Sequence, residues 1–220
     1  MSHKKIKKFA PIVTRIIPAI SGIWLGKVTG LENMPKDKAF IIAPNHSSYI
    51  EHFLIGSLVV PYINRNLFFI AKKEHFEGIF QKSWHRLWSK YITYIPIDRD
   101  KGEEALKVAL SYLKKRAVIV VYPEGTRTLT GKIQKGKTGV ARLALWAKVP
   151  VVPVGIKGTF KILPKGKIIP KFRKEVSLKI GKPIYFNKYY NRKVSKRLLR
   201  EITKTVMNKI AALSGQKYEP

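Results

Sequence analysis

Hydrophobic residues along this chain fall into two alternating patterns. Short continuous apolar runs, typical of strands covered on both faces, lie at 40–43, 67–71, 92–97, 117–122, 149–155 and 176–180. Stretches with helical spacing, in which apolar residues recur at steps of three and four, lie at 53–59, 79–90, 102–116, 138–148 and 195–213. Strands that alternate with helices predict an α/β domain with a mostly parallel sheet flanked by helices.

A separate amphipathic pattern occupies the N-terminus, after the basic run Lys-Lys-Ile-Lys-Lys at 4–8. Its apolar face consists of Phe9, Ile12, Val13, Ile16, Ile17, Ile20, Ile23 and Trp24. Pro18 should divide the segment into two short helices, because proline breaks a helix interior. We therefore expect residues 1–28 to form an amphipathic two-helix membrane anchor and residues 29–220 to form the α/β domain.

The N-terminal segment allows other interpretations. A signal peptide is disfavoured, because no small-residue cleavage site follows and Trp24 and Lys27 come directly after the apolar face. A membrane-spanning helix is also disfavoured, because Arg15 and Pro18 interrupt a run that is barely long enough to cross. An N-terminal helix that packs on the core of the domain stays open as an alternative to the anchor.

Charge narrows the possible partners. The net charge of +31 indicates a polyanionic partner, which could be nucleic acid, an anionic membrane or a phosphorylated substrate. Residues 125–220 carry 24 of the 44 lysines and arginines but only 3 of the 13 acidic residues.

The chain contains no cysteine, which excludes disulfides and a thiol nucleophile. The five histidines lack a paired HxxxH spacing, so we expect no metal site.

Candidate chemistry begins directly after the run at 40–43. His46 is followed five positions later by Glu51, and a histidine with a carboxylate in reach can act as a general base. The two side chains would lie about 140° apart on one helix, so they can meet only if His46 precedes the helix. Ser47 and Ser48 are good N-cap residues and would start the helix there. A capping turn with a surface histidine fits the same residues.

Polar residues also follow three other predicted strands. They are Lys72 and Lys73, then Asp98 and Arg99, then the run Glu124-Gly-Thr-Arg127. Sites of open α/β sheets form at the carboxyl ends of strands, so these groups could share one pocket. Arg99 and Arg127 suit a phosphate, because guanidinium donates two parallel hydrogen bonds, although each could instead pair with a neighbouring carboxylate. Lys137 precedes a predicted helix start, where an anion is favoured.

The motifs, in this order, resemble the glycerophospholipid acyltransferase family. The block Asn-His-x4-Asp matches Asn45–Glu51, and Ile-Asp-Arg matches Ile97–Arg99. Glu-Gly-Thr-Arg is intact at Glu124–Arg127, Lys-x-Gly stands at Lys137–Gly139, and a Val-Pro-Val-Val-Pro-Val strand follows at 149–154. The resemblance covers roughly residues 30–180, and the amphipathic N-terminus is similar to the two-helix membrane motif of this family.

The resemblance implies roles for individual residues. His46 would be the general base for the free hydroxyl of a lipid acceptor, oriented by Glu51 in the place of the usual aspartate. The resemblance further implies an acceptor-binding pocket made of Arg99, Glu124, Gly125, Thr126, Arg127 and Lys137. The hydroxyl would attack the acyl thioester directly, without an acyl-enzyme, and no metal or bound cofactor would take part.

The resemblance also implies partners and a location. Lysophosphatidic acid would be the acceptor, an acyl carrier protein or coenzyme A thioester the donor, and phosphatidic acid the product. The enzyme would be monotopic on an anionic membrane, at the cytoplasmic face of the cell membrane. Glutamate at position 51 also occurs in related enzymes that acylate lipid A or glycolipids, so another lipid acceptor is an alternative. A non-enzymatic basic module for membranes or RNA is a further one, but without an RNA-binding signature we expect no nucleic-acid partner.

Overall fold

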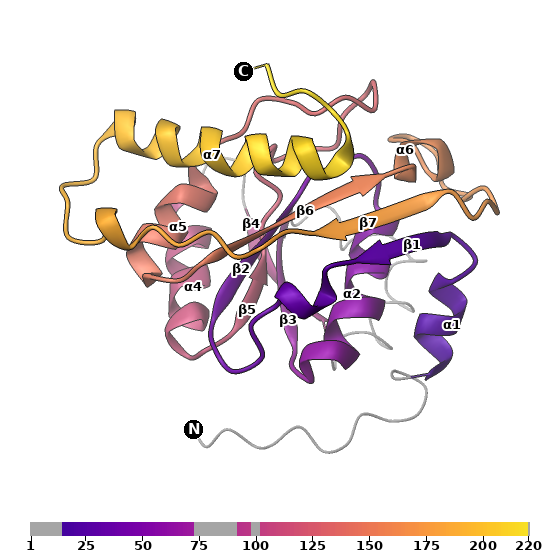
Figure 1. The fold of residues 1–220 in the computed structure, drawn as a ribbon, viewed down its shortest axis with the longest axis horizontal. Coiled ribbons are helices and arrows are strands. Elements are labelled where there is room, and N and C mark those ends of the chain that lie inside the picture. Colours follow the sequence, from indigo (N-terminus) through magenta and orange to yellow (C-terminus); the bar gives the residue numbers. More distant parts are fainter. Residues whose placement is uncertain (1–14, 73–91, 98–101, 220) are drawn as a thin grey trace.

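A seven-stranded sheet forms the centre of the computed structural model, which describes residues 15–72, 92–97 and 102–219 (Figure 1). The strands are β1 (Leu25–Thr29), β2 (Phe40–Pro44), β3 (Leu67–Lys72), β4 (Ile92–Ile97), β5 (Val118–Val120), β6 (Val151–Lys157) and β7 (Val176–Ile180). Their order is β1-β7-β6-β2-β5-β3-β4. The β6–β7 pair is antiparallel, and every other neighbouring pair in this sheet is parallel.

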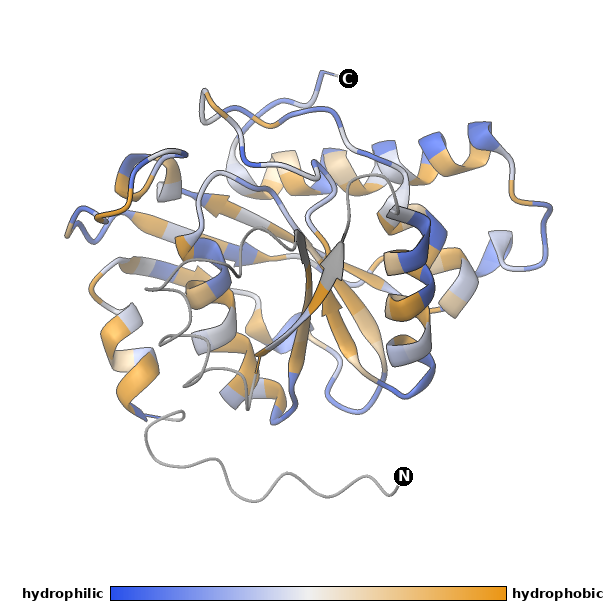
Figure 2. Cartoon of the chain, turned by 180° about the vertical axis from the view of Figure 1, so that it is seen from behind, coloured by the Kyte–Doolittle hydropathy of each residue, from blue (hydrophilic) through white to orange (hydrophobic). Residues whose placement is uncertain are grey.

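Helices cover both faces of the sheet. They are α1 (Ile17–Ser21), α2 (Ile50–Ile63), α4 (Gly102–Lys114), α5 (Gly139–Ala147), α6 (Thr159–Ile162) and α7 (Lys196–Ser214), with short 3₁₀ turns at Leu31–Asn33 and Asn187–Tyr189. Strand β2 shows the two faces directly: Phe40 and Ile42 pack with α1 and α2, whereas Ile41 and Ala43 pack with α4, α5 and α7. Figure 2 shows the apolar strands enclosed between these layers. The expected α/β fold with a mostly parallel sheet is confirmed.

Helix α7 shows how local sequence fixes an element. The side chain of Ser195 accepts a hydrogen bond from the amide of Leu198 (3.1 Å), and Gly215 ends the helix in the left-handed conformation. Its buried stripe packs onto the β6 side of the sheet, while its other face carries lysines and arginines. The predicted bounds, 195–213, differ from the observed ones by one residue at each end.

The N-terminal region differs from the expectation. Residues 25–28 of the predicted anchor belong to β1, which pairs in parallel with β7 from the far end of the chain. Ile17 and Trp24 are buried in the core, so these two predicted membrane-binding residues contact the protein, whereas Ile16 and Ile20 are exposed. Pro18 lies in the first turn of α1 and interrupts no described helix.

Three predictions of the N-terminal half lie partly outside the described residues. Phe9, Ile12 and Val13 of the predicted anchor are among them, as are the helix expected at 79–90 and the residues Asp98 and Arg99. Within the part of the chain that the structure describes, no helix has the length and apolar character needed to cross a membrane.

Candidate active site

The site forms where the carboxyl ends of β2, β5 and β6 meet. Asn45, the first residue after β2, joins β2 to β6 through two buried hydrogen bonds with Ile156. Its Nδ2 donates to the Ile156 carbonyl (2.9 Å), and its Oδ1 accepts from the Ile156 amide (2.7 Å). The amide of Thr128, after β5, donates to the carbonyl of His46 (2.9 Å). The turn that carries His46 is therefore fixed by both neighbouring strand ends.

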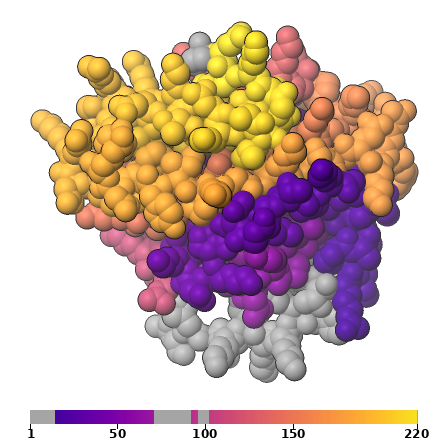
Figure 3. Space-filling model, in the orientation of Figure 1, coloured from indigo at the N-terminus to yellow at the C-terminus, as the bar shows by residue number. Residues whose placement is uncertain are grey.

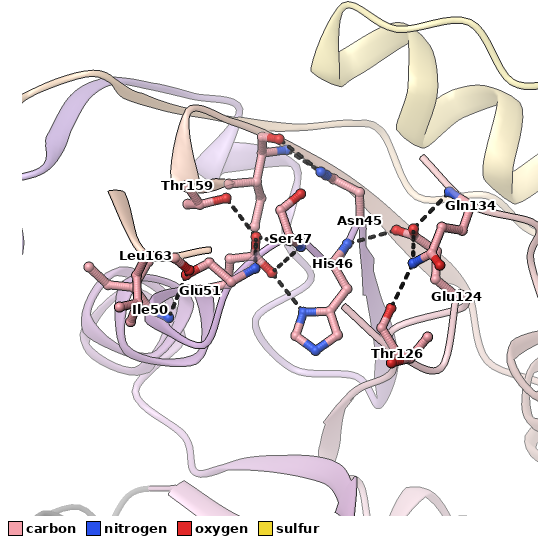
Figure 4. Close-up of polar contacts among 12 residues, drawn as sticks. Asn45, His46, Ser47, Ile50, Glu51, Glu124, Thr126, Gln134, Thr159 and Leu163 are labelled. Carbon is pink, nitrogen blue, oxygen red and sulfur yellow. Dashed lines mark hydrogen bonds and ion pairs between the residues drawn. The ribbon is translucent and has the colours of Figure 1, made fainter. Parts of the chain in front are cut away.

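His46 and Glu51 form the predicted pair. The imidazole Nδ1 lies 2.8 Å from Glu51 Oε2, and both side chains are buried (Figure 4). Helix α2 begins at Ile50, so Glu51 lies in its first turn and His46 precedes it, as the spacing required. An ionised Glu51 accepts a hydrogen bond from Nδ1–H, which keeps the ring proton on Nδ1 and leaves the lone pair of the ring on Nε2. Figure 4 shows this second nitrogen pointing away from Glu51.

Glu51 also takes over the capping role expected of the serines. Its Oε1 accepts hydrogen bonds from the amides of Ser47 (2.9 Å) and Ser48 (3.0 Å) and from the hydroxyl of Thr159 (2.6 Å). The N-cap of α2 is Tyr49, which makes no side-chain capping bond. The glutamate therefore joins three segments: the turn at residues 45–48, here called the catalytic turn, the start of α2, and the residues that follow β6. Its position is fixed by all three.

Burial controls the protonation of the pair. Desolvation, followed by the nearby charge of Arg127, lowers the pKa of His46 to about 3, so the ring is neutral at physiological pH. Desolvation raises the pKa of Glu51 to about 8, although the bonds from Thr159, Ser47 and Ser48 lower it. A proton held on Glu51 can be donated to Nδ1, which places the ring proton on Nε2. Nε2 of His46 is therefore a free base only after Glu51 has lost its proton.

Glu124 faces inward and binds the protein. Its Oε1 accepts from the amide of His46 (2.7 Å), and its Oε2 accepts from the amide of Gln134 (2.8 Å) and from that side chain (3.3 Å). Burial raises the pKa of Glu124 to about 7, while the hydrogen bonds lower it. The sequence predicted that Glu124 binds substrate; in the structure its Oε1 holds the His46 turn and its Oε2 holds the segment at Gln134.

Arg127 packs over the ring of Tyr49 and acts electrostatically on His46. The guanidinium carbon lies 3.3 Å from the centre of the Tyr49 ring, a close cation–π contact. The buried Nη1 atom has no hydrogen-bond partner in the described part of the chain. A buried cationic donor without an acceptor is costly, so this atom is suited to receive an anionic ligand.

Gly125 brings a second cation to the same turn. Its φ of +70° favours glycine, and a β-carbon there would lie 3.1–3.3 Å from the side chain of Lys137, including Nζ. Lys137 itself is held by its amide, which donates to the carbonyl of Pro123 (2.8 Å). Thr126 is exposed beside them. The turn 124–127 therefore presents two cations and a hydroxyl close to His46.

The sequence did not single out Tyr122 for a role. Its ring stacks on the imidazole of His46, with 3.8 Å between ring centres and 23° between planes. The side chain is buried, which raises the pKa of Tyr122 well above its usual value. This contact and the bond to Glu51 together fix the plane of the imidazole.

The site occupies the region that matches a known family. The sequence model of the acyltransferase family matches residues 26–157, which include every residue of the described site except Thr159. This chain belongs to the acyltransferase family. Among its relatives, the 1-acyl-sn-glycerol-3-phosphate acyltransferase of Bacillus subtilis is 31% identical over 72% of this chain and 73% of its own length. The chain spans about half the length of the plant relatives, such as the chloroplast enzyme BAT2 of Brassica napus (30% identical).

A solved structure supports the same assignment. The crystal structure of the 1-acyl-sn-glycerophosphate (LPA) acyltransferase PlsC from Thermotoga maritima superimposes with a TM-score of 0.65 and 27% identity. The superposition covers 94% of this chain and 81% of that chain. This acyltransferase therefore shares its fold with an enzyme of that name.

The acyltransferase site contains most of the predicted residues. The structure brings together His46, Glu51, Glu124, Gly125, Thr126, Arg127 and Lys137, whereas Arg99 lies outside the described residues. The sequence missed Thr159, because the strand before it was expected to end at 155 and instead reaches Lys157. With that end point, the rule that polar residues follow strand ends would have found it. Among the described residues, no three acidic or histidine side chains are grouped so that they could hold a metal ion.

Proposed function

We propose that this acyltransferase moves a fatty acyl group from a thioester to the free hydroxyl of lysophosphatidic acid, giving phosphatidic acid. The observation that carries the proposal is the His46–Glu51 pair, in which Nε2 of His46 is a free base when Glu51 is ionised. Beside it lies Nη1 of Arg127, which has no hydrogen-bond partner among the described residues. The names of relatives from Bacillus subtilis and Saccharomyces cerevisiae support this acceptor.

Proton transfer by His46 would start the reaction. Its Nε2 takes the proton of the acceptor hydroxyl while the oxygen attacks the thioester carbonyl carbon. The imidazolium that forms is stabilised by ionised Glu51, which accepts a hydrogen bond from Nδ1–H over 2.8 Å. Collapse of the tetrahedral intermediate breaks the carbon–sulfur bond, and His46 returns the proton to the departing thiolate. The ester and the free thiol leave, and the enzyme is unchanged.

Direct transfer suits the side chains near the base. The chain has no cysteine to form an acyl-enzyme. The hydroxyl of Ser48 donates to the carbonyl of Leu163 (2.6 Å) and accepts from the amide of Ile50 (3.3 Å), so it is turned away from His46. A hydrolase in which His46 activates Ser48 is therefore disfavoured.

The phosphate of the acceptor would bind at the turn 124–127. Arg127 offers a buried donor, Thr126 precedes it on the same turn, and the side chain of Lys137 lies against Gly125 of that turn. Arg99, in the second family motif, is proposed as a further phosphate ligand. Gly125 permits the turn, and Glu124 acts on this pocket by holding the His46 turn.

The donor, the location and the absence of a cofactor belong to the proposal. Acyl carrier protein or coenzyme A would deliver the thioester, and both are anionic, which suits a chain with a net charge of +31. The mechanism needs no metal or bound cofactor. We place the enzyme on the cytoplasmic face of an anionic membrane, where donor and lysolipid are both present.

A transfer assay with several acceptors tests this function. Purified enzyme and the His46→Ala variant receive acyl-coenzyme A or acyl carrier protein thioester, with lysophosphatidic acid, monoacylglycerol or a glycolipid as acceptor. We expect phosphatidic acid as the main product and a loss of about 10²–10⁴-fold in the variant, because general base catalysis contributes about that much. Thermal melting checks that the variant is folded. Near-normal turnover by His46→Ala would overturn the base assignment, and equal rates with monoacylglycerol would overturn the acceptor.

A further inference from the structure

Exposed apolar side chains are concentrated on one edge of the molecule. Ten large hydrophobic side chains are exposed among the described residues, and six of them belong to α1 with the residues next to it and to the loop between α6 and β7. These six are Ile16, Ile20, Ile23, Ile168, Ile169 and Phe172. Scattered exposed apolar residues are ordinary, but a contiguous group marks an interaction surface.

The loop at 164–175, here called the basic–apolar loop, combines two kinds of side chain. Ile168, Ile169 and Phe172 are 88%, 81% and 73% exposed. Five lysines or arginines surround them in the sequence, with Glu175 as the one acidic residue of the loop. Figure 2 shows the alternation of hydrophilic and hydrophobic residues at the tip of this loop.

Trp24 ties the basic–apolar loop to the body of the domain. The buried indole donates from Nε1 to the carbonyl of Lys171 (2.9 Å) and stacks on Phe172, with 6.0 Å between ring centres. Its other side meets Phe53 of α2 edge to face at 6.1 Å. The amide of Lys171 also donates to the carbonyl of Ile162 (2.9 Å). The fold therefore holds this loop in place while its apolar tip points to solvent.

Trp24 also joins this loop to α1, which ends three residues earlier in the chain. Helix α1 buries Ile17 and leaves Ile16 and Ile20 exposed. Figure 1 shows α1 and the basic–apolar loop on the same edge of the molecule, and Figure 3 shows the two segments following one another along that edge. The two apolar groups thus lie on the same edge of the molecule.

This edge borders the active site. The carbonyl of Leu163, just before the basic–apolar loop, accepts the hydroxyl of Ser48 in the catalytic turn. Thr159, four residues earlier, donates to Glu51. A ligand bound on this edge is consequently close to the turn that carries His46.

We propose that the basic–apolar loop, together with α1, is a docking surface for an anionic phospholipid bilayer, with Ile168, Ile169 and Phe172 inserted among the lipids. Apolar tips among lysines match an interface of acyl chains beneath anionic headgroups. An acidic protein would match the positive charge of the loop, but it would leave the two exposed isoleucines without an apolar environment. The proposal rests on the proposed function only in that a bilayer holds the acceptor lipid.

Vesicle flotation of the full chain tests the docking surface. The loop variant is Ile168→Asp/Ile169→Asp/Phe172→Asp, and the matched control is Val108→Asp/Tyr185→Asp/Val194→Asp, which makes the same charge change at exposed apolar positions elsewhere. Vesicles contain phosphatidylcholine with or without phosphatidylglycerol. We expect the loop variant to bind anionic vesicles at least roughly 100-fold more weakly, since each inserted side chain contributes about tenfold or more. The control should bind like the wild type, and thermal melting confirms that both variants are folded.

Transfer assays separate this proposal from the proposed function. The loop variant should keep wild-type turnover on a detergent-dispersed acceptor and lose turnover on vesicle-embedded acceptor. Wild-type protein that binds vesicles through the loop but acylates nothing would leave docking intact and overturn the function. Unchanged flotation of the loop variant would overturn docking and leave the function intact. The docking proposal would also be overturned if the loop variant no longer bound acyl carrier protein, or no longer formed a dimer, while its flotation stayed unchanged.

Discussion

The catalytic turn and the basic–apolar loop are neighbours with opposite organisation. In the turn, the polar atoms of Glu51 and Glu124 are buried and bonded to protein donors. In the loop, Ile168 and its apolar neighbours are exposed and lie among charged residues. Leu163 and Ser48 link the two regions through a hydrogen bond of 2.6 Å. Buried polar atoms that are satisfied by protein donors are the rule in a folded protein, whereas a contiguous group of exposed apolar side chains marks an interaction surface.

The difference teaches which part of the function each region can supply. A buried network that satisfies its own groups is positioned by the fold before any substrate arrives, which is what proton transfer requires. Apolar side chains that remain mostly exposed, such as Ile168 and Ile169, contribute little to folding and gain from burial against an external partner. Changes in the turn should therefore alter chemistry and leave vesicle binding intact, whereas changes in the loop should do the reverse.

Replacing Glu51 should produce the largest effect on chemistry. In Glu51→Gln, the amide group can donate to Nδ1, so the ring proton moves to Nε2 and the base is lost. We expect turnover on detergent-dispersed acceptor to fall by about 10²–10⁴-fold, with flotation unchanged. Glu51→Asp, which keeps the charge but shortens the side chain, should lose less. Turnover of Glu51→Gln within a few-fold of wild type would contradict the role of the pair.

Arg127 tests whether a buried cationic donor, which has no hydrogen-bond partner in the part of the chain that the structure describes, binds the acceptor. Arg127→Met should raise the KM for lysophosphatidic acid by roughly 10–100-fold, because a hydrogen bond to a charged group contributes about 1.5–3 kcal/mol. Arg127→Lys should recover part of the affinity, since lysine keeps the charge without the paired donors. Steady-state kinetics measure both. An equal loss with a phosphate-free acceptor would show that Arg127 does not bind the phosphate.

The pH profile tests the buried pair itself. Burial raises the pKa of Glu51 to about 8, and the ring is a free base only when that carboxyl is ionised. Because burial also lowers the pKa of His46 to about 3, the imidazolium does not limit activity near neutrality. We therefore expect kcat/KM to rise with pH through neutrality and level off above about 8. A profile that falls over this range would contradict the assignment.

Thr159 provides a control on that profile. Its hydroxyl bond to Glu51 lowers the pKa of the carboxyl. Thr159→Val removes the bond and should move the rising limb to higher pH, by roughly one unit, while Thr159→Ser should retain the wild-type profile. A profile of Thr159→Val that coincides with the wild type would show that this bond does not tune the pair.

The sequence predicted the elements whose signal is local. The central strands are continuous apolar runs, so their existence and parallel pairing followed from pattern alone, and β7 has the predicted bounds. Strand β1 was missed because it contains Gly26 and Lys27, alternates poorly, and pairs only with β7, some 150 residues later in the chain. Its hydrogen bonds come from tertiary structure, which local periodicity does not report.

The same distinction applies to the candidate site. His46 and Glu51 are five residues apart and were predicted, whereas Thr159 reaches Glu51 from another strand end 108 residues away. Glu124 was assigned to substrate because its motif suggested it, but its position follows from the amides of His46 and Gln134, which only the fold brings together. Residue types at a site can be read from motifs; their partners depend on the packing of distant segments.

Tyr122 should give the smallest effect, and it tests whether the catalytic turn needs every contact around His46. The ring stacks on the imidazole, while its hydroxyl is buried with no hydrogen-bond partner among the described residues. Tyr122→Leu removes the stacking, which is worth about 0.5–1.5 kcal/mol, so kcat should fall by roughly 2–10-fold with an unchanged KM. Tyr122→Phe keeps the stacking and should match or slightly exceed wild-type stability, because it removes an unsatisfied buried group. Kinetics and thermal melting measure the two variants together. A large loss of kcat in Tyr122→Phe would mean that the hydroxyl, and not the ring, acts in the reaction.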